Sequence, residues 1–188
     1  MSNKSKLRTK YFQIRQSLTE EELLVAEKNI LSIVKSNLSI FQNKRVSCYW
    51  SIGREMPTHN LIDLISRTGS ELYLPKIVTG SREMKFSKLE DKSKLTKNRF
   101  GILETGRTKE ISPEDLDLIL LPCICFDKKG YRIGMGKGYY DYSLRNINMV
   151  STKLILVAYD FQKIENCFPE NHDVMAESCL TDSELYKF

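Results

Sequence analysis

The sequence predicts an α/β fold, a three-layer α/β/α sandwich with a mostly parallel central sheet, formed by residues 1–188 as a single domain. Two segments, "LDLILLPCICF" (116–126) and "KLILVAYDF" (153–161), are apolar along most of their length. Continuous apolar runs are typical of strands buried on both faces of a parallel sheet. Segments with helical spacing alternate with the predicted strands, as crossover connections between parallel strands require.

Two helices are predicted ahead of the first strand. In the first, residues 4–17, the apolar side chains Leu7, Tyr11 and Ile14 recur at helical spacing. The second is expected to begin at Thr19, because Thr19 followed three residues later by Glu22 forms a capping box.

The remaining elements follow from short apolar runs separated by turn residues. The other predicted strands are 45–52, 71–78 and 84–89, and the other predicted helices are 59–68 and 139–147. Residues 91–115 are polar and irregular, and a loop of that length in a compact domain often has a function.

The composition favours a small-molecule partner. The net charge of +5 suits a polyanionic ligand, but lysines are spread along the chain, so no nucleic-acid partner is expected. The longest apolar run is too short to cross a bilayer, and the basic N-terminal segment lacks the apolar core of a secretory signal. We therefore expect a cytoplasmic monomer with no membrane association.

The cysteines and histidines argue against two common kinds of site. The chain has five cysteines and two histidines, and it contains no C-x-x-C motif. Cys123 and Cys125 lie inside an apolar run, so buried reduced thiols are expected rather than a zinc site. With so few histidines, a His-based catalytic triad is also not expected.

The segment "GYRIGMGKGYYD" (130–141) is the strongest local signal. Gly134, Gly136 and Gly138 alternate with larger residues, which lets backbone N–H groups approach a ligand closely. The spacing differs from both the phosphate loop of nucleotide triphosphatases and the dinucleotide-binding fingerprint. On spacing alone, a phosphate-binding loop and a flexible surface hairpin both remain open.

Charged residues flank these glycines. Lys137 offers a point charge and Arg132 a planar fork of donors, and both suit phosphate oxygens. Asp141 could hold Mg²⁺ against the phosphates or stabilise the start of the helix that follows.

At these residues the chain resembles the 5-formyltetrahydrofolate cyclo-ligase family, also called 5,10-methenyltetrahydrofolate synthetases. The family signature P-x-x-x-F-D-x-x-G-x-R-x-G-x-G-x-G-Y-Y-D is met at every fixed position by "PCICFDKKGYRIGMGKGYYD" (122–141). A K-x-x-x-R pair at Lys4 and Arg8, "EMPT" at 55–58 and "ENHDV" at 170–174 agree in the same order.

The resemblance implies an ATP-dependent ligase that requires Mg²⁺. Such an enzyme converts 5-formyltetrahydrofolate to 5,10-methenyltetrahydrofolate and releases ADP and phosphate. ATP phosphorylates the formyl oxygen, and attack by N10 then closes the ring. The protein mainly positions groups and neutralises charge, so no nucleophilic side chain is needed.

The resemblance also implies roles at matching positions. The expected ATP-binding residues are Lys4, Arg8, Arg132, Gly134, Gly136, Lys137, Gly138, Tyr139 and Tyr140. The expected folate-binding residues are Trp50, Glu55, Phe100, Met135, Gly136, Lys137, Gly138 and Tyr139. The expected catalytic residues are Arg132, Lys137 and Tyr139, and the expected metal ligands are Asp141 and Asp173.

Several of these positions have ordinary alternatives. Lys4 and Arg8 could belong to a solvated basic helix, Trp50 could be a core aromatic, and Asp173 could be a plain loop carboxylate. Tyr142 stands where many family members have Arg, so one phosphate or surface contact is expected to be missing.

A nucleotide- or RNA-binding module on the same fold, without cyclo-ligase activity, is the competing function. Stacking on Tyr139 and Tyr140 would suit RNA. Glu55 and Asp141 argue against it, because carboxylates repel a phosphate backbone.

Overall fold

The computed structural model describes residues 2–98, 101–106, 108–147 and 151–188, and the predicted folate contact Phe100 lies outside these ranges. An eight-stranded sheet with the order β13-β12-β10-β7-β1-β2-β3-β6 dominates the described chain. Its strands are β1 (Arg45–Ser47), β2 (Glu71–Ile77), β3 (Met84–Lys88), β6 (Glu110–Ile111), β7 (Leu118–Pro122), β10 (Lys153–Val157), β12 (Ser178–Leu180) and β13 (Leu185–Lys187).

The strands from β12 to β2 run parallel to one another, and antiparallel strands flank them at both edges. The predicted α/β fold with a mostly parallel central sheet is therefore confirmed.

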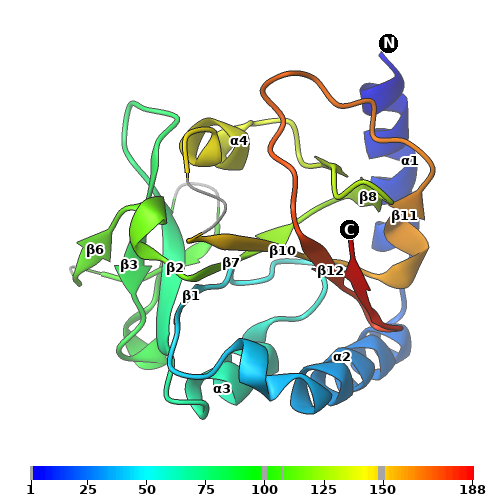
Figure 1. Cartoon of the computed structure of the whole chain (residues 1–188). Coiled ribbons are helices and arrows are strands. Elements are labelled where there is room, and N and C mark those ends of the chain that lie inside the picture. The colour runs from blue at the N-terminus through cyan, green and yellow to red at the C-terminus, as the bar shows by residue number, and fades with distance from the viewer. Residues whose placement is uncertain (1, 99–100, 107, 148–150) are drawn as a thin grey trace.

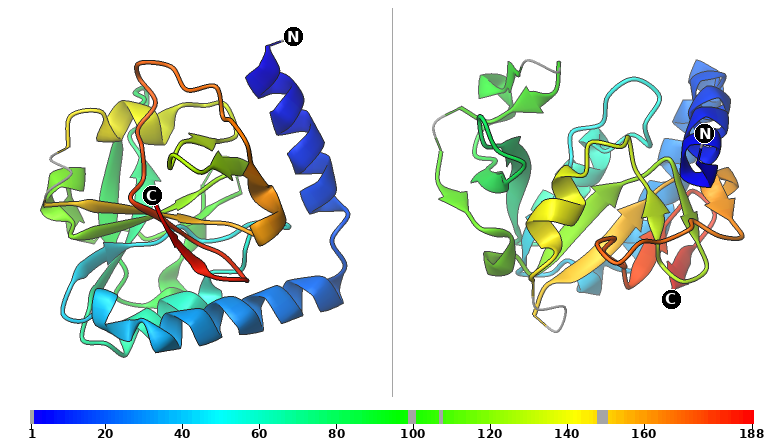
Figure 2. Two further views of the ribbon diagram at one scale, coloured as in Figure 1. Left: turned by 45° about the vertical axis from the view of Figure 1, so that its right-hand side comes forward. Right: turned by 90° about the horizontal axis from the view of Figure 1, so that it is seen from above.

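Helices cover one face of this sheet, and a helix with a second small sheet covers the other (Figure 1). The helices are α1 (Asn3–Gln16), α2 (Glu20–Ser36), α3 (His59–Ser66) and α4 (Tyr139–Leu144). The small sheet has the order β11-β8-β9, with strands β8 (Cys125–Asp127), β9 (Arg132–Ile133) and β11 (Lys163–Ile164). α2 and α3 lie on one face of the large sheet, while α4 and the small sheet lie on the other. α1 stands beside the small sheet before the chain turns into α2 (Figure 2).

The core explains why two central strands have such continuous apolar sequences. In β7, Leu118 and Leu120 pack into the cluster beneath α2 and α3, whereas Ile119 and Leu121 pack into the cluster on the opposite face. β10 alternates between the same two clusters. Because both faces are covered, neither strand has a polar side.

The apolar run 116–126 was predicted as one strand, and that prediction is wrong. β7 ends at Pro122, and β8 begins at Cys125 in the other sheet. Pro122 has no N–H to continue the ladder, which allows the chain to leave the sheet there. Because both strands are buried, their apolar residues run together in the sequence without a visible break.

Other boundaries also differ from the predictions. The predicted strands 45–52 and 153–161 and the predicted helix 139–147 are all longer than the elements that form, and β12 and β13 were not predicted. The polar stretch 91–115 contains β6 and a hairpin of β4 (Thr96–Lys97) and β5 (Leu103–Glu104). Short 3₁₀ helices span Leu38–Ile40, Lys92–Lys94, Pro113–Asp115 and Asp160–Gln162.

Two expectations from composition can be compared with the structure. All five cysteines are buried free thiols, as predicted. Within the described ranges, no helix has both the length and the apolar character needed to cross a membrane.

Candidate active site

A cavity of about 500 Å³ lies at the carboxyl ends of three parallel strands. Its wall includes Trp50, which follows β1, Ile77 at the end of β2 and Pro122 at the end of β7. Parallel sheets place ligand sites at this edge, and the volume is typical of a small-molecule site. The glycine loop 134–138 and one side of α1 form further parts of the wall.

The glycine loop takes a backbone path that ordinary residues disfavour. Gly136 has φ of +86° and Gly138, which precedes α4, has φ of +69°. A Cβ on Gly136 would lie 3.3 Å from the guanidinium carbon of Arg8. Gly134 differs, because a Cβ there would meet no atom within 4 Å. Packing among the described residues therefore does not require a glycine at position 134.

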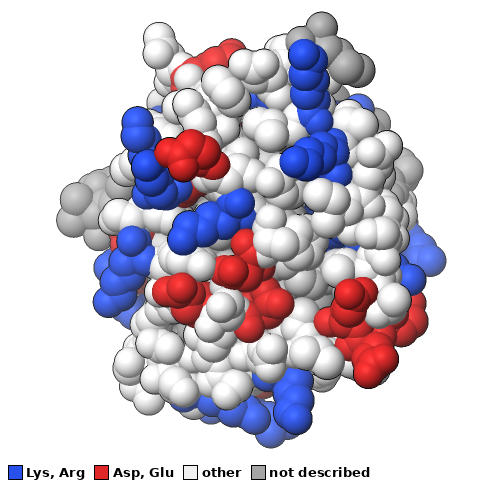
Figure 3. All heavy atoms as spheres, turned by 90° about the vertical axis from the view of Figure 1, so that its right-hand side faces the viewer, with Lys and Arg blue, Asp and Glu red and all other residues white. Residues whose placement is uncertain are grey.

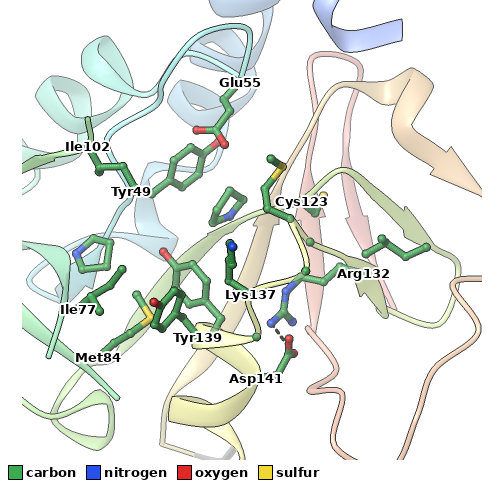
Figure 4. Close-up of a pocket in the computed structure, with 18 of the residues that line it drawn as sticks. Tyr49, Glu55, Ile77, Met84, Ile102, Cys123, Arg132, Lys137, Tyr139 and Asp141 are labelled. Atoms are coloured by element: carbon green, nitrogen blue, oxygen red, sulfur yellow. Dashed lines mark hydrogen bonds and ion pairs between the residues drawn. The ribbon is translucent and has the colours of Figure 1, made fainter. Parts of the chain in front are cut away.

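Arg132, which was predicted to bind phosphate, forms an ion pair with Asp141, which was predicted to bind a metal ion. Arg132 is buried on β9, and its Nη2 lies 2.7 Å from Oδ1 of Asp141 in the first turn of α4 (Figure 4). Its Nη1 donates to the carbonyl of Val174 at 2.9 Å. The pair therefore ties the small sheet to α4 and to the loop before β12.

Lys4 and Arg8 both turn from α1 towards the cavity. Lys4 Nζ lies 3.0 Å from Oε1 of Glu170 and also bonds to Asp173. Burial alone would lower the pKa of Lys4, but its hydrogen bonds to Asp173 and Glu170 outweigh burial and raise that pKa. Arg8 Nε donates to the carbonyl of Gly134 at 2.7 Å. Both residues therefore belong to the cavity wall and not to a solvated helix face.

Glu55 lies at the other end of the cavity, beside the buried Tyr49 (Figure 4). Its side chain is 12% exposed, and its Oε2 accepts the backbone N–H of Ile52 at 3.1 Å. Arg15 Nη2 lies 3.9 Å from its Oε1. Burial raises the pKa of Glu55, while Arg15 and the N–H of Ile52 act in the opposite direction.

The predicted aromatic and loop residues also line this cavity. Trp50 does so while packing edge-on against His59, with 4.5 Å between ring centroids, so it is both a wall residue and a packing residue. Lys137 projects into the cavity between Tyr139 and Arg132 (Figure 4). Tyr140 lines it as well, and burial raises the pKa of that phenol.

Sequence reasoning missed two parts of the wall. Arg15 lies on α1 with Lys4 and Arg8, and their helical spacing was a usable signal. The apolar part formed by Ile77 and Met84 had no such signal, because these residues meet only when β2 and β3 pair.

A divalent metal would find two carboxylates at the cavity. Asp141 and Asp173 both line it, and each uses one oxygen to accept hydrogen bonds from the protein. Across the residues that the structure describes, there is no group of three or more His, Cys, Asp or Glu side chains that could hold a metal ion without further ligands. The donor set suits Mg²⁺ that takes its other ligands from water and a substrate phosphate.

Comparisons with known proteins identify relatives of the whole chain. The model of the 5-formyltetrahydrofolate cyclo-ligase family matches residues 1–182. The 5-formyltetrahydrofolate cyclo-ligase of Haemophilus influenzae is 30% identical over 174 residues, covering 91% of this chain and 93% of that protein. The mouse cyclo-ligase is 30% identical over 191 residues, covering 95% and 93%.

One solved structure has a similar level of sequence identity to this chain. The NMR structure of Aquifex aeolicus 5,10-methenyltetrahydrofolate synthetase superimposes with a TM-score of 0.85 at 31% identity. The superposition covers 99% of this chain and 93% of that one. The resemblance in the glycine loop thus extends over nearly the whole sequence and the whole fold, and the chain belongs to the 5-formyltetrahydrofolate cyclo-ligase family.

Proposed function

We propose that this protein is the ligase that closes 5-formyltetrahydrofolate to 5,10-methenyltetrahydrofolate at the expense of ATP. One observation carries the proposal beyond family membership. A single cavity has cationic groups and a glycine loop at one end and a mostly buried carboxylate beside apolar side chains at the other. That combination suits a triphosphate next to a pterin, which presents hydrogen-bond donors on an otherwise flat ring.

The phosphate end holds ATP. Lys4, Arg8 and Lys137 offer positive charge there, and Gly134 leaves its backbone open to a ligand. Arg132 is paired with Asp141, so its proposed part at the phosphate end is to position the groups around the phosphates. Gly136, Gly138, Tyr139 and Tyr140 complete the proposed ATP contacts.

The carboxylate end holds the folate. Glu55 accepts hydrogen bonds from the pterin, and Trp50, Met135, Ile77 and Met84 supply apolar contacts for its rings. The glycine loop lies between the two ends, so Gly136, Lys137, Gly138 and Tyr139 can contact both ligands.

The chemistry needs charge stabilisation and close placement. The formyl oxygen attacks the γ-phosphorus, the bond to the β-phosphate oxygen breaks, and ADP leaves. N10 then attacks the formyl carbon and loses its proton, and the carbon–oxygen bond breaks to release phosphate. Lys137 stabilises the negative charge on the transferring phosphoryl group, while Arg132 and Tyr139 position it.

The proposed metal ligands are Asp141 and Asp173, directly or through water. Bound Mg²⁺ would neutralise phosphate charge. The protein supplies carboxylate oxygens there while Arg132 and Lys4 hold the two carboxylates in place.

An RNA-binding module remains the competing function, and the surface gives it little support. Among the residues that the structure describes, the face on which α1 lies mixes Lys and Arg with Asp and Glu and forms no continuous positive surface (Figure 3). Nucleic acid is attracted by clustered positive charge. The monomeric state and the cytoplasmic location stay predictions from the sequence.

One assay distinguishes the cyclo-ligase function from the RNA-binding function. The protein is mixed with Mg-ATP and 5-formyltetrahydrofolate, and the methenyl chromophore is followed together with ADP. The proposal expects both products to form in equal amounts and only when both substrates are present. ADP release without the chromophore, or tight RNA binding without turnover, would contradict it.

A further inference from the structure

Arg15 is a buried charge at the cavity for which the proposed reaction has no role so far. Its side chain is only 6% exposed, and Nη1 donates to the carbonyl of Cys123 at 3.3 Å. Its Nε has no hydrogen-bond partner among the described residues. A buried guanidinium with so few partners is costly. The guanidinium also lies over the ring of Phe12, 5.7 Å from its centroid, but neither this contact nor the bond to Cys123 pairs its charge with an anion.

The nearest carboxylate gives Arg15 a use. In the described part of the chain, Glu55 is the one carboxylate within ion-pair distance of Arg15, at 3.9 Å. We propose that Arg15 is a positioning residue that keeps Glu55 ionised and oriented to accept hydrogen bonds from the pterin of the bound folate. This inference rests on the proposed function, because it assigns Arg15 to the folate end of that site.

The protonation state of Glu55 decides how well it can bind a pterin. An ionised carboxylate accepts hydrogen bonds at both oxygens, whereas a protonated one has a donor in place of one acceptor. Burial raises the pKa of Glu55, and Arg15 is the cation that opposes this rise. Without Arg15, that pKa would rise further, and a larger share of Glu55 would be protonated at neutral pH.

The other titratable groups around Glu55 do not change charge in the relevant pH range. Tyr49, Tyr140, Tyr159 and Cys123 all interact electrostatically with Glu55. Burial raises the pKa of each, that of Cys123 to about 12, so all four are neutral near pH 7. His172 and Asp173 also line the cavity, so the difference between the pH profiles of the wild type and an Arg15 variant, rather than either profile alone, should report the influence of Arg15 on Glu55.

The backbone at Glu55 is held independently of Arg15. The hydroxyl of Tyr159 donates to the carbonyls of Arg54 and Glu55 at 3.3 and 3.2 Å. The side chain of Glu55 is held by Ile52 as well. Replacing Arg15 should thus change the charge state of Glu55 more than the position of its loop.

The test compares Arg15→Gln with the wild type by calorimetric binding of 5-formyltetrahydrofolate, without ATP, from weakly acidic to weakly alkaline pH. Affinity should fall as the pH drops through the pKa of Glu55, and in Arg15→Gln this fall should begin at a higher pH. At neutral pH, Arg15→Gln should bind roughly tenfold more weakly. Arg15→Lys, which keeps the charge, should recover much of the loss.

Controls separate this effect from a general loss of structure. Lys10→Gln removes an exposed charge from the same helix and should leave the pH profile unchanged. A non-hydrolysable ATP analogue should bind Arg15→Gln as it binds the wild type. If Arg15→Gln does not fold, Arg15→Met gives the same readout, because it fills similar space without a polar group to bury.

Two results would overturn the inference while leaving the proposed function in place. One is an unshifted pH profile in the folded Arg15 variant. The other is that Arg15→Gln weakens folate binding by the same factor in Glu55→Gln as it does in the wild type, because Arg15 would then act without Glu55. A wild-type protein that does not bind 5-formyltetrahydrofolate would instead overturn the proposed function and, with it, the inference.

Discussion

At the scale of single residues, Lys137 and Arg132 carry the same charge but are held very differently. Arg132 is buried and paired with Asp141, while Lys137 is an exposed loop residue that projects into the cavity. The proposal that Lys137 follows a phosphoryl group during transfer fits its exposed side chain, whereas the ion pair with Asp141 holds Arg132 in the cavity wall. The proposed roles of the two cations, stabilising the transferring group and positioning it, follow from this difference.

Lys137→Ala should lower turnover roughly 10²–10³-fold. In other enzymes a loss of this size follows the removal of one hydrogen-bond donor to the charge that develops in the transition state. The melting temperature should hardly change, because the side chain is exposed. Steady-state kinetics and thermal melts measure the two effects. Lys129→Ala, at an exposed lysine outside the cavity wall, is the matched control. Wild-type turnover in Lys137→Ala would remove Lys137 from the mechanism.

Asp141→Asn should have two separable effects. The buried Arg132 loses its carboxylate partner, which should cost about 1–3 kcal/mol of the free energy of unfolding. If Asp141 also helps to hold Mg²⁺, the variant should need more Mg²⁺ for half-maximal activity. Thermal melts and a Mg²⁺ titration measure these effects. A lower melting temperature with an unshifted titration would leave Asp141 a structural role alone.

At the scale of elements, the glycine loop could be predicted and much of its surroundings could not. Alternating glycines beside Lys137 form a local pattern that a sequence shows directly. The break between β7 and β8 was hidden, because buried strands in two different sheets have equally apolar sequences. The apolar wall at Ile77 and Met84 depends on the pairing of β2 with β3, which the local sequence does not predict.

Two glycines of the loop should respond differently to alanine. Gly136→Ala should destabilise the protein by about 1–2 kcal/mol, because the residue has a left-handed backbone, with φ of +86°, and its Cβ would crowd Arg8. Gly134→Ala should keep the wild-type melting temperature, because a Cβ there meets nothing within 4 Å. Both should weaken ATP binding, measured by calorimetry. Unchanged ATP affinity in Gly134→Ala would mean that no ligand approaches that residue.

At the scale of the whole molecule, the first helix and the loop before the last two strands meet at the cavity. Lys4 near the N-terminus binds Glu170 and Asp173 in the loop that leads to the last strands. Burial alone would raise the pKa of Asp173, but the hydrogen bond and charge of Lys4 and the backbone N–H of Glu170 together outweigh burial and lower that pKa. The attachment of α1 to this loop through Lys4 and Asp173 should therefore depend on pH.

This coupling predicts the pH range in which Lys4 matters. A lowered folded-state pKa of Asp173 contributes stability above the pKa of an unfolded aspartate, about 3.9, and this contribution is lost as the pH falls through the folded value. The raised pKa of Lys4 keeps the pair charged up to strongly alkaline pH. The melting temperature of Lys4→Met should therefore fall below the wild-type value at neutral pH and approach it in acid. Lys6→Met, an exposed residue of α1, is the control. A difference that does not vary with pH would contradict the prediction.

The central claim is that this cavity activates the formyl oxygen by phosphorylation and closes the ring in the same site. The most direct measurement starts from 5-formyltetrahydrofolate carrying ¹⁸O in the formyl group, with Mg-ATP and the wild-type protein. Mass spectrometry of the released phosphate follows the label, and absorbance follows the methenyl product. One labelled oxygen in each phosphate, matched by one methenyl product, is the predicted result. Unlabelled phosphate, or no phosphate and no chromophore, would contradict the claim.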